Sequence, residues 1–246
     1  MYRRNAIISA GKYMGDEKSV LRWGGLAGMM VPIFFILTAV ILLALVPQEP
    51  ADPEGLVMRF PEDRAAIAVG EGFYLVAVIL LVTLFLALYR ALRGTSVATA
   101  LFGSGLGLVG LVVLAVGALP NIAFNPISDL YHAPGATPEE QATLVLMWQS
   151  IQGIFNETDT VGFILMAIGF VVLGVAMLGS PAFGKRFGGV SMVLGVVVVV
   201  GMSILGVDSD SVIPFVLIAF IVFPLLFGWK LYSLSKGLQG ALGSGG

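Results

Sequence analysis

The chain has 246 residues, of which 58% are hydrophobic and 11% are charged, with a formal net charge of −2. Its mean hydropathy is +0.98. Because water-soluble domains carry roughly 25% charged residues, this composition excludes an ordinary water-soluble fold and indicates a membrane protein. The slight negative charge argues against a nucleic-acid partner.

Two kinds of chemistry are excluded by residues that the chain lacks. Cysteine is absent, which excludes disulfides, thiol catalysis and cysteine metal sites. The one histidine, His132, lies in a polar segment between spans, so no histidine is available to bind haem inside the membrane. We therefore expect no cofactor and no metal site.

Six stretches are long and apolar enough to cross a membrane, since a span needs roughly 20 mostly apolar residues. We expect the second to start after Pro61, the fourth to start at Pro138 and Glu139, and the sixth to bend at Pro224, which lacks a backbone N–H. Because backbone groups in lipid must be bonded within the chain, all six are predicted to be helices. The spans lie near residues 24–46, 62–89, 98–119, 139–178, 187–205 and 212–234.

The predicted fold is therefore all-α, a polytopic bundle of six transmembrane helices forming one membrane domain over residues 1–242. The last residues, 243–246, read Gly-Ser-Gly-Gly and resemble a leftover linker, so they enter no functional argument.

The placement of lysine and arginine predicts how the helices are oriented. With both termini in the cytoplasm, only Arg59 and Arg64 of the 13 basic residues fall outside, which leaves 11 inside. We therefore predict a multi-pass protein of the cell membrane with cytoplasmic termini. The longer loops, expected at 47–64 and 120–137, would face outward.

Polar side chains gather where the second and fourth spans approach the outer membrane surface. Acids inside a membrane are costly and rarely face lipid, which makes Glu71, Glu157 and Asp159 candidate functional residues. The fourth span carries a polar stripe on one side of the helix, and two asparagines follow the third span beside prolines. The candidate pocket consists of Glu71, Asn121, Asn125, Gln149, Gln152, Asn156, Glu157 and Asp159.

Two interpretations of these residues stay open. In the first, they line an outward-facing pocket for a small polar molecule, a cation or a lipid head group. In the second, they cap helices and pair with one another at the membrane surface. Amides and acids without a nucleophile and base do not form a catalytic set, so no catalytic residue is predicted. We expect Glu71 to face the bundle near Asn156 and Asp159.

Glycines at helical spacing indicate close contacts between helices. The pairs Gly24 with Gly28 and Gly103 with Gly107 are four residues apart, as in small-residue helix interfaces. Packing within the bundle is favoured, because any six-helix bundle needs such contacts. A homo-oligomer or a protein partner bound through these glycine-rich faces is the alternative, and membrane lipids are expected around the chain.

The segment 159–201 carries a family resemblance. It starts Asp159-Thr-Val-Gly-Phe, continues through a span with Gly169 and Gly174, and reads Ser180-Pro-Ala-Phe-Gly-Lys-Arg-Phe-Gly before a second glycine-spaced span. It resembles the uncharacterised six-helix prokaryotic membrane proteins grouped as domain-of-unknown-function family 4386, where a short basic turn with phenylalanine joins the fourth and fifth spans. The resemblance implies fold and topology, and it transfers no activity or catalytic residue.

Three classes of function follow from these patterns. The first is a non-enzymatic accessory, scaffold or interaction component, favoured by the lack of deep charges and catalytic groups. The second is a small transporter or a ligand- or lipid-binding sensor that uses the outward polar pocket. The third is a membrane enzyme acting on lipid, which would need a nucleophile, a base or a metal cluster.

Overall fold

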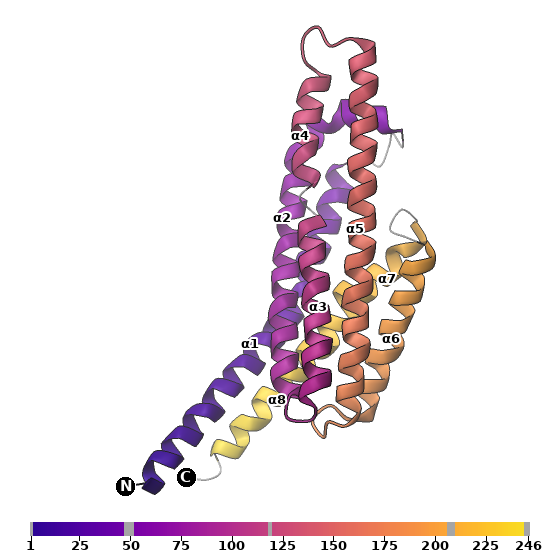
Figure 1. Cartoon of the computed structure of the whole chain (residues 1–246). Coiled ribbons are helices and arrows are strands. Elements are labelled where there is room, and N and C mark those ends of the chain that lie inside the picture. Colours follow the sequence, from indigo (N-terminus) through magenta and orange to yellow (C-terminus); the bar gives the residue numbers. More distant parts are fainter. Residues whose placement is uncertain (1, 47–51, 118–119, 206–209, 244–246) are drawn as a thin grey trace.

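The computed structural model describes residues 2–46, 52–117, 120–205 and 210–243, so residues 244–246 of the predicted linker lie outside it. Within these ranges every regular element is helical, and six helices are long and apolar enough to span a membrane. The predicted all-α fold with six spans is confirmed. The elements are α1 (Tyr2–Leu45), α2 (Pro53–Leu92), α3 (Val97–Gly117), α4 (Pro120–Tyr131), α5 (Pro138–Leu178), α6 (Gly184–Leu205), a 3₁₀ turn (Asp210–Val212), α7 (Ile213–Leu217), a π turn (Ile218–Val222) and α8 (Phe223–Gly243) (Figure 1).

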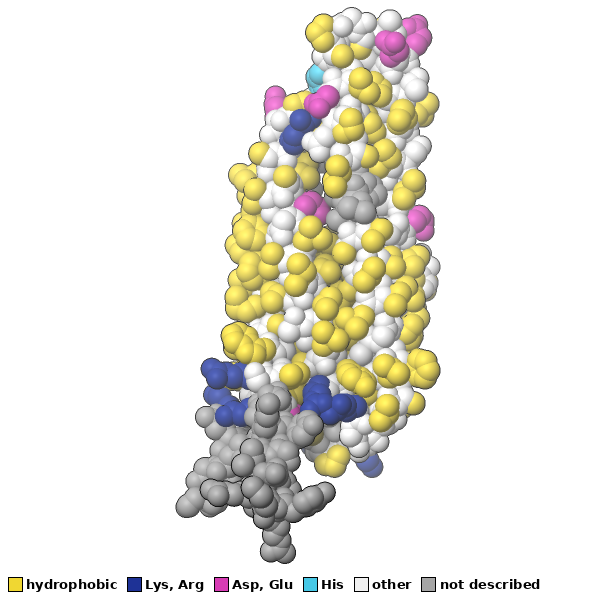
Figure 2. All heavy atoms as spheres, turned by 60° about the vertical axis from the view of Figure 1, so that its left-hand side comes forward, with side chains coloured by type: hydrophobic (Ala, Val, Ile, Leu, Met, Phe, Trp, Pro, Cys, Tyr) yellow, Lys and Arg dark blue, Asp and Glu magenta, His cyan; other side chains and the backbone are white. Residues whose placement is uncertain are grey.

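The part of the molecule that would lie in the hydrocarbon of the membrane is called the membrane band below. The two shorter spanning helices indicate its width. At about 1.5 Å per residue, the 21 residues of α3 and the 22 of α6 extend about 31 and 33 Å, close to the hydrocarbon thickness. Lysine and arginine side chains gather at one end of this band (Figure 2). Most acidic side chains visible in the same view lie in the other half of the molecule, together with a smaller basic patch, and a mainly apolar surface lies between the two ends.

At the acidic end, α2 and α5 continue beyond the band, and α4 lies beside them there (Figure 1). The α3 helix ends at Gly117, which lies against Asp159, and Leu42 near the end of α1 lies against Gly70. The parts of α2, α4 and α5 beyond this level, residues 53–69 and 120–158, are called the stalk below. The stalk has its own core, in which Phe124 stacks on Trp148 with ring centroids 4.0 Å apart.

The predicted loop at 47–64 is wrong over most of its length, because α2 already begins at Pro53. Asp52 caps this helix by accepting a hydrogen bond from the Gly55 N–H at 3.0 Å. Pro61 lies inside the helix rather than before it. It lacks an N–H for the Val57 carbonyl, and the Ser128 hydroxyl of α4 donates to that carbonyl instead, at 3.5 Å.

The predicted loop at 120–137 is also wrong, because its first part forms α4. Pro120 is the first residue of the helix, where a missing N–H costs nothing. Pro126 lies inside it, and the Asn125 side-chain amide donates to the freed Ile122 carbonyl at 3.4 Å. His132 follows α4, with Nε2 3.1 Å from the Met58 carbonyl oxygen, and so links α4 to α2.

The start of α5 agrees with the prediction at Pro138. Thr137 caps it, since its hydroxyl accepts from the Glu140 N–H while the Glu140 carboxylate accepts from the Thr137 N–H. From there α5 runs for 41 residues, about 61 Å, through the stalk and the whole membrane band. It therefore connects everything in the stalk directly to the membrane bundle.

Pro224 changes the sixth span in a specific way. A π turn over Ile218–Val222 precedes it, and the Phe223 N–H donates to the Ile218 carbonyl five residues back. A widened turn makes room for a proline ring without breaking the helix. The Phe223 ring then stacks on Phe170 of α5, with ring centroids 3.8 Å apart, at the centre of the core.

The glycine pairs singled out above pack inside the chain. A Cβ atom on Gly28 would lie 2.9 Å from the Cα of Gly228 in α8. A Cβ on Gly103 would lie 2.8 Å from the backbone nitrogen of Leu173 in α5. Where these glycines lie, the helix backbones are in direct contact, and a partner would have to bind elsewhere.

Candidate functional site

An acidic site lies where the stalk leaves the membrane band. Glu71 is half-buried on α2, and Asp159 on α5 is only 8% exposed. The two carboxyl groups are close enough to interact electrostatically with each other, and both interact with Tyr74, one turn further along α2. We call these three side chains the junction site.

Two polar atoms in the junction site have no partner among the described residues. Asp159 Oδ1 and the Tyr74 hydroxyl are buried and form no hydrogen bond there. Within the same part of the chain, neither Glu71 nor Asp159 takes part in an ion pair. A buried polar group without a partner is costly, so these atoms need an explanation that the protein itself does not provide.

Gly117 makes room for the buried acid. A Cβ atom at this position would lie 2.8 Å from Asp159 Oδ1 and 3.3 Å from a methyl carbon of Thr158. Because glycine has no Cβ, the end of α3 can lie directly beside the carboxyl group. The site is therefore enclosed by α2, α5 and the end of α3.

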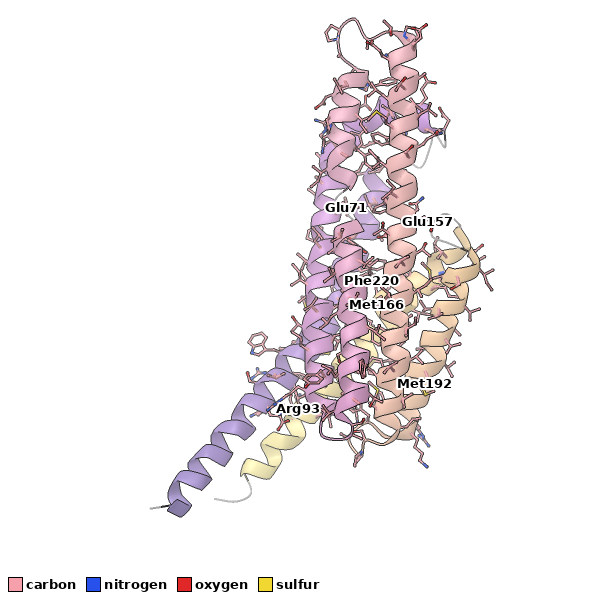
Figure 3. All side chains as sticks on the ribbon, viewed as in Figure 1. Glu71, Arg93, Glu157, Met166, Met192 and Phe220 are labelled. Atoms are coloured by element: carbon pink, nitrogen blue, oxygen red, sulfur yellow. The ribbon has the colours of Figure 1, made fainter. Side chains whose placement is uncertain are left out.

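The other residues of the predicted polar stripe have contacts or exposed positions of their own. The Gln152 side-chain amide donates to Asn156 Oδ1 at 3.0 Å, and the Thr160 hydroxyl donates to the Asn156 carbonyl; both bonds lie within α5. Gln149 is exposed in a groove on the stalk. Glu157 is exposed on the side of α5 away from α2, at about the level of Glu71 (Figure 3).

The two asparagines do not join Glu71 and Asp159 either. Asn125 uses its amide to bond the Ile122 carbonyl within α4. The side chain of Asn121 lies outside the part of the chain that the structure describes. Sequence reasoning missed Tyr74, although it lies three residues after Glu71, which places both on one face of the helix.

The comparison with protein families decides where the chain belongs. A family model described as a domain of unknown function, DUF4386, matches residues 45–237. The chain belongs to the DUF4386 family. This confirms the resemblance drawn from residues 159–201. Neither a curated protein nor a solved structure gave a match.

The DUF4386 match covers more than the membrane helices. It begins at the end of α1 and runs into α8, so it includes the stalk and all three residues of the junction site. The description of the family names no activity. The surfaces and side chains of the chain itself are therefore the basis for its proposed function.

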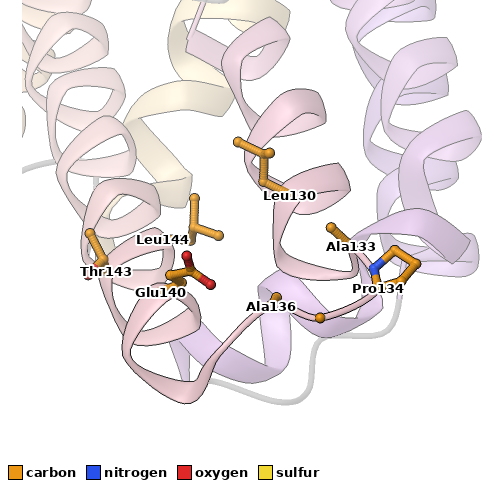
Figure 4. Close-up of a pocket in the computed structure, with 8 residues that line it drawn as sticks. Leu130, Ala133, Pro134, Ala136, Glu140, Thr143 and Leu144 are labelled. Atoms are coloured by element: carbon orange, nitrogen blue, oxygen red, sulfur yellow. The ribbon is translucent and has the colours of Figure 1, made fainter.

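The tip of the stalk carries two open grooves. One, of about 480 Å³, lies between the end of α4 and the first turns of α5, with Leu130, Pro134 and Glu140 in its lining (Figure 4). The other, of about 530 Å³, lies between Glu54 at the start of α2 and Gln149 of α5. Across the described residues no three histidine, cysteine or acidic side chains converge as a metal site.

The stalk also exposes large apolar side chains outside the membrane band. On α5, Leu146 is 63% exposed and Ile154 is 60% exposed, and on α4 Leu130 is 58% exposed. No charged residue occurs on α5 between Glu140 and Glu157. A helix surface that faces water normally carries charge, so an uncharged face with exposed large apolar side chains is unusual for this position.

Proposed function

We propose that this protein is a non-enzymatic interaction component of the cell membrane, which binds a partner protein through the stalk. The observation that carries the proposal is the uncharged face of α5 beyond the membrane band, on which the large apolar side chains of Leu146, Met147 and Ile154 are exposed. Exposed apolar patches of this kind mark protein contacts. The stalk core and the Thr137 cap hold the helix in place without a partner, so the face is available for binding.

The partner expected on this face is a protein with an apolar helix of its own. Two helices pack by placing the side-chain ridges of one into the grooves of the other, and the uncharged stretch of α5 offers such ridges over about four turns. The grooves at the tip, which contain Glu54 and Glu140, add acidic groups at one end of this surface. The partner should therefore carry basic residues where it reaches the tip.

Transport is not proposed for this chain. Secondary transporters hold their substrates near the bilayer midplane, and the junction site lies at the edge of the band instead. The centre of the bundle is filled by aromatic rings from α2, α5 and α8, including Phe85, Phe170 and Phe223. This packing supports a rigid anchor for the stalk.

The proposal requires the stalk to face outward, with both termini in the cytoplasm. The basic residues at the opposite end of the band support this orientation through the positive-inside rule (Figure 2). Alkaline phosphatase, which is active only outside the cytoplasm, should be active when inserted after Ala136 and inactive when fused after Lys236. Green fluorescent protein fused after Lys236 should fluoresce. The reverse pattern would refute the orientation.

Photo-crosslinking in intact cells tests the partner. A photoreactive amino acid at Leu146 or Ile154 should give a discrete adduct that contains a second protein, because these side chains would be covered by it. The matched control is Val193 of α6, which is 62% exposed within the membrane band and should meet lipid. No adduct, or equal adducts from Leu146 and Val193, would contradict the proposal. So would an adduct that contains only a second copy of this chain.

A further inference from the structure

The junction site joins two helices at one level of the molecule. Glu71 and Tyr74 come from α2, and Asp159 comes from α5. All three interact electrostatically, and Asp159, with 8% of its surface exposed, is the most enclosed of them. Ring contacts agree with this placement: the Phe220 ring lies 5.6 Å from the Tyr74 ring and 5.7 Å from that of Phe163, one turn after Asp159. Asp159 Oδ1 itself lies beside Gly117.

These oxygens lack the partners that buried oxygens normally have. Asp159 Oδ1 and the Tyr74 hydroxyl are buried without a hydrogen bond from the described residues. Arg64, two turns before Glu71 on α2, is bonded instead to Asp129 of α4 and to the Asn125 carbonyl. No arginine or lysine of the described chain pairs with either acid of the site.

Like charges held together in an apolar surrounding destabilise each other, and removing them from water adds to the cost. A bound cation reverses both effects, because it attracts both carboxylates and replaces the water that they lose. We propose that Glu71, Tyr74 and Asp159 form a binding site for a small monovalent cation, with Na⁺ as the natural probe. Carboxylate and hydroxyl oxygens are the ligands that hard cations prefer.

The number of acids favours a monovalent ion over Ca²⁺. Calcium takes 6–8 oxygen ligands, commonly including several carboxylates. The junction site offers two carboxyl groups, and no third acidic side chain converges on them within the described residues. A bound ion would tie α2 to α5 where the stalk leaves the membrane, and so would stabilise the stalk on its anchor.

The test uses the full chain purified in detergent at mildly alkaline pH. Its thermal unfolding midpoint is followed as NaCl replaces N-methylglucamine chloride at constant ionic strength. A cation that binds only the folded state should raise the midpoint in a saturable way. Asp159→Asn and Glu71→Gln should weaken the apparent Na⁺ affinity at least about tenfold, and Tyr74→Phe by a few-fold, because charged ligands bind most strongly.

Glu157→Gln is the matched control, since it removes an exposed acid two residues from Asp159 and should keep the wild-type response. In N-methylglucamine alone, Asp159→Asn should unfold no earlier than the wild type, because it removes an unpaired buried acid. The proposal is overturned if the wild type responds equally to both salts, if Ca²⁺ stabilises it and Na⁺ does not, or if Glu157→Gln loses the response as Asp159→Asn does. If Asp159→Asn does not fold, Glu71→Gln and Tyr74→Phe decide the question.

Discussion

Replacing Gly110 by alanine is expected to destabilise the bundle by about 1–3 kcal/mol, the usual cost of forcing extra atoms into a packed interior. A Cβ atom on Gly110 would lie 2.6 Å from the backbone nitrogen of Met166 and 2.7 Å from the carbonyl oxygen of Gly162. Both atoms belong to the backbone of α5, which cannot turn aside as a side chain can. The two helices would have to separate, and the contacts of Gly169 with α3 would loosen as well.

Gly105→Ala is the control for this change, because it is the same substitution on the same helix. A Cβ on Gly105 would meet nothing within 4 Å, and alanine favours a helix more than glycine does. Reversible unfolding in mixed micelles with increasing SDS gives the free energy of each variant. Equal effects of the two substitutions would show that close packing of α3 on α5 contributes nothing to stability.

The membrane helices were predictable from the sequence because their signals are local. Hydropathy over about 20 residues identifies a span without any knowledge of its neighbours. The start of α5 is also encoded locally, since Thr137, Pro138 and Glu140 together form a helix cap. The same holds for the basic turn between α5 and α6, where Gly184 has a φ of 74° that favours glycine.

The stalk helices were not predictable in this way. Pro61 and Pro126 read as helix breakers, yet both lie inside helices. In α2 the freed Val57 carbonyl is bonded by Ser128, which is 71 residues away in the sequence. Such a contact exists only once α4 has packed on α2, so a reading of either segment alone predicts a loop.

The candidate site was predicted in part. Acids inside spans are costly, which singled out Glu71, Glu157 and Asp159. The structure places Glu71 and Asp159 close enough to interact electrostatically and leaves Glu157 exposed. The amides of α5 were grouped with them by helical periodicity, and Asn121 and Asn125 by their place just after the third span. Neither signal gives the distance from one helix to another. Gln152 and Asn156 bond each other on α5, and Asn125 bonds its own helix. Tyr74 was missed because a tyrosine in an apolar span looks like an ordinary residue of the hydrophobic core.

Replacing Phe170 by alanine is expected to cost about 3–5 kcal/mol of stability, the range for deleting a large aromatic side chain from a core. The ring is fully buried, stacks on Phe223 at 3.8 Å between centroids and lies 4.8 Å from Phe85, so it joins α5 to α8 and α2. That range includes transfer of the ring from water, and lipid tails are as apolar as the core, so the loss here measures mainly packing and should lie near the lower end of the range. Phe102→Ala, at a ring that is 66% exposed on α3, is the matched control and should cost far less in the same SDS unfolding assay. If both variants lose the same stability, contact with lipid or detergent replaces the aromatic core equally well, and the bundle is not held by the fit of its interior.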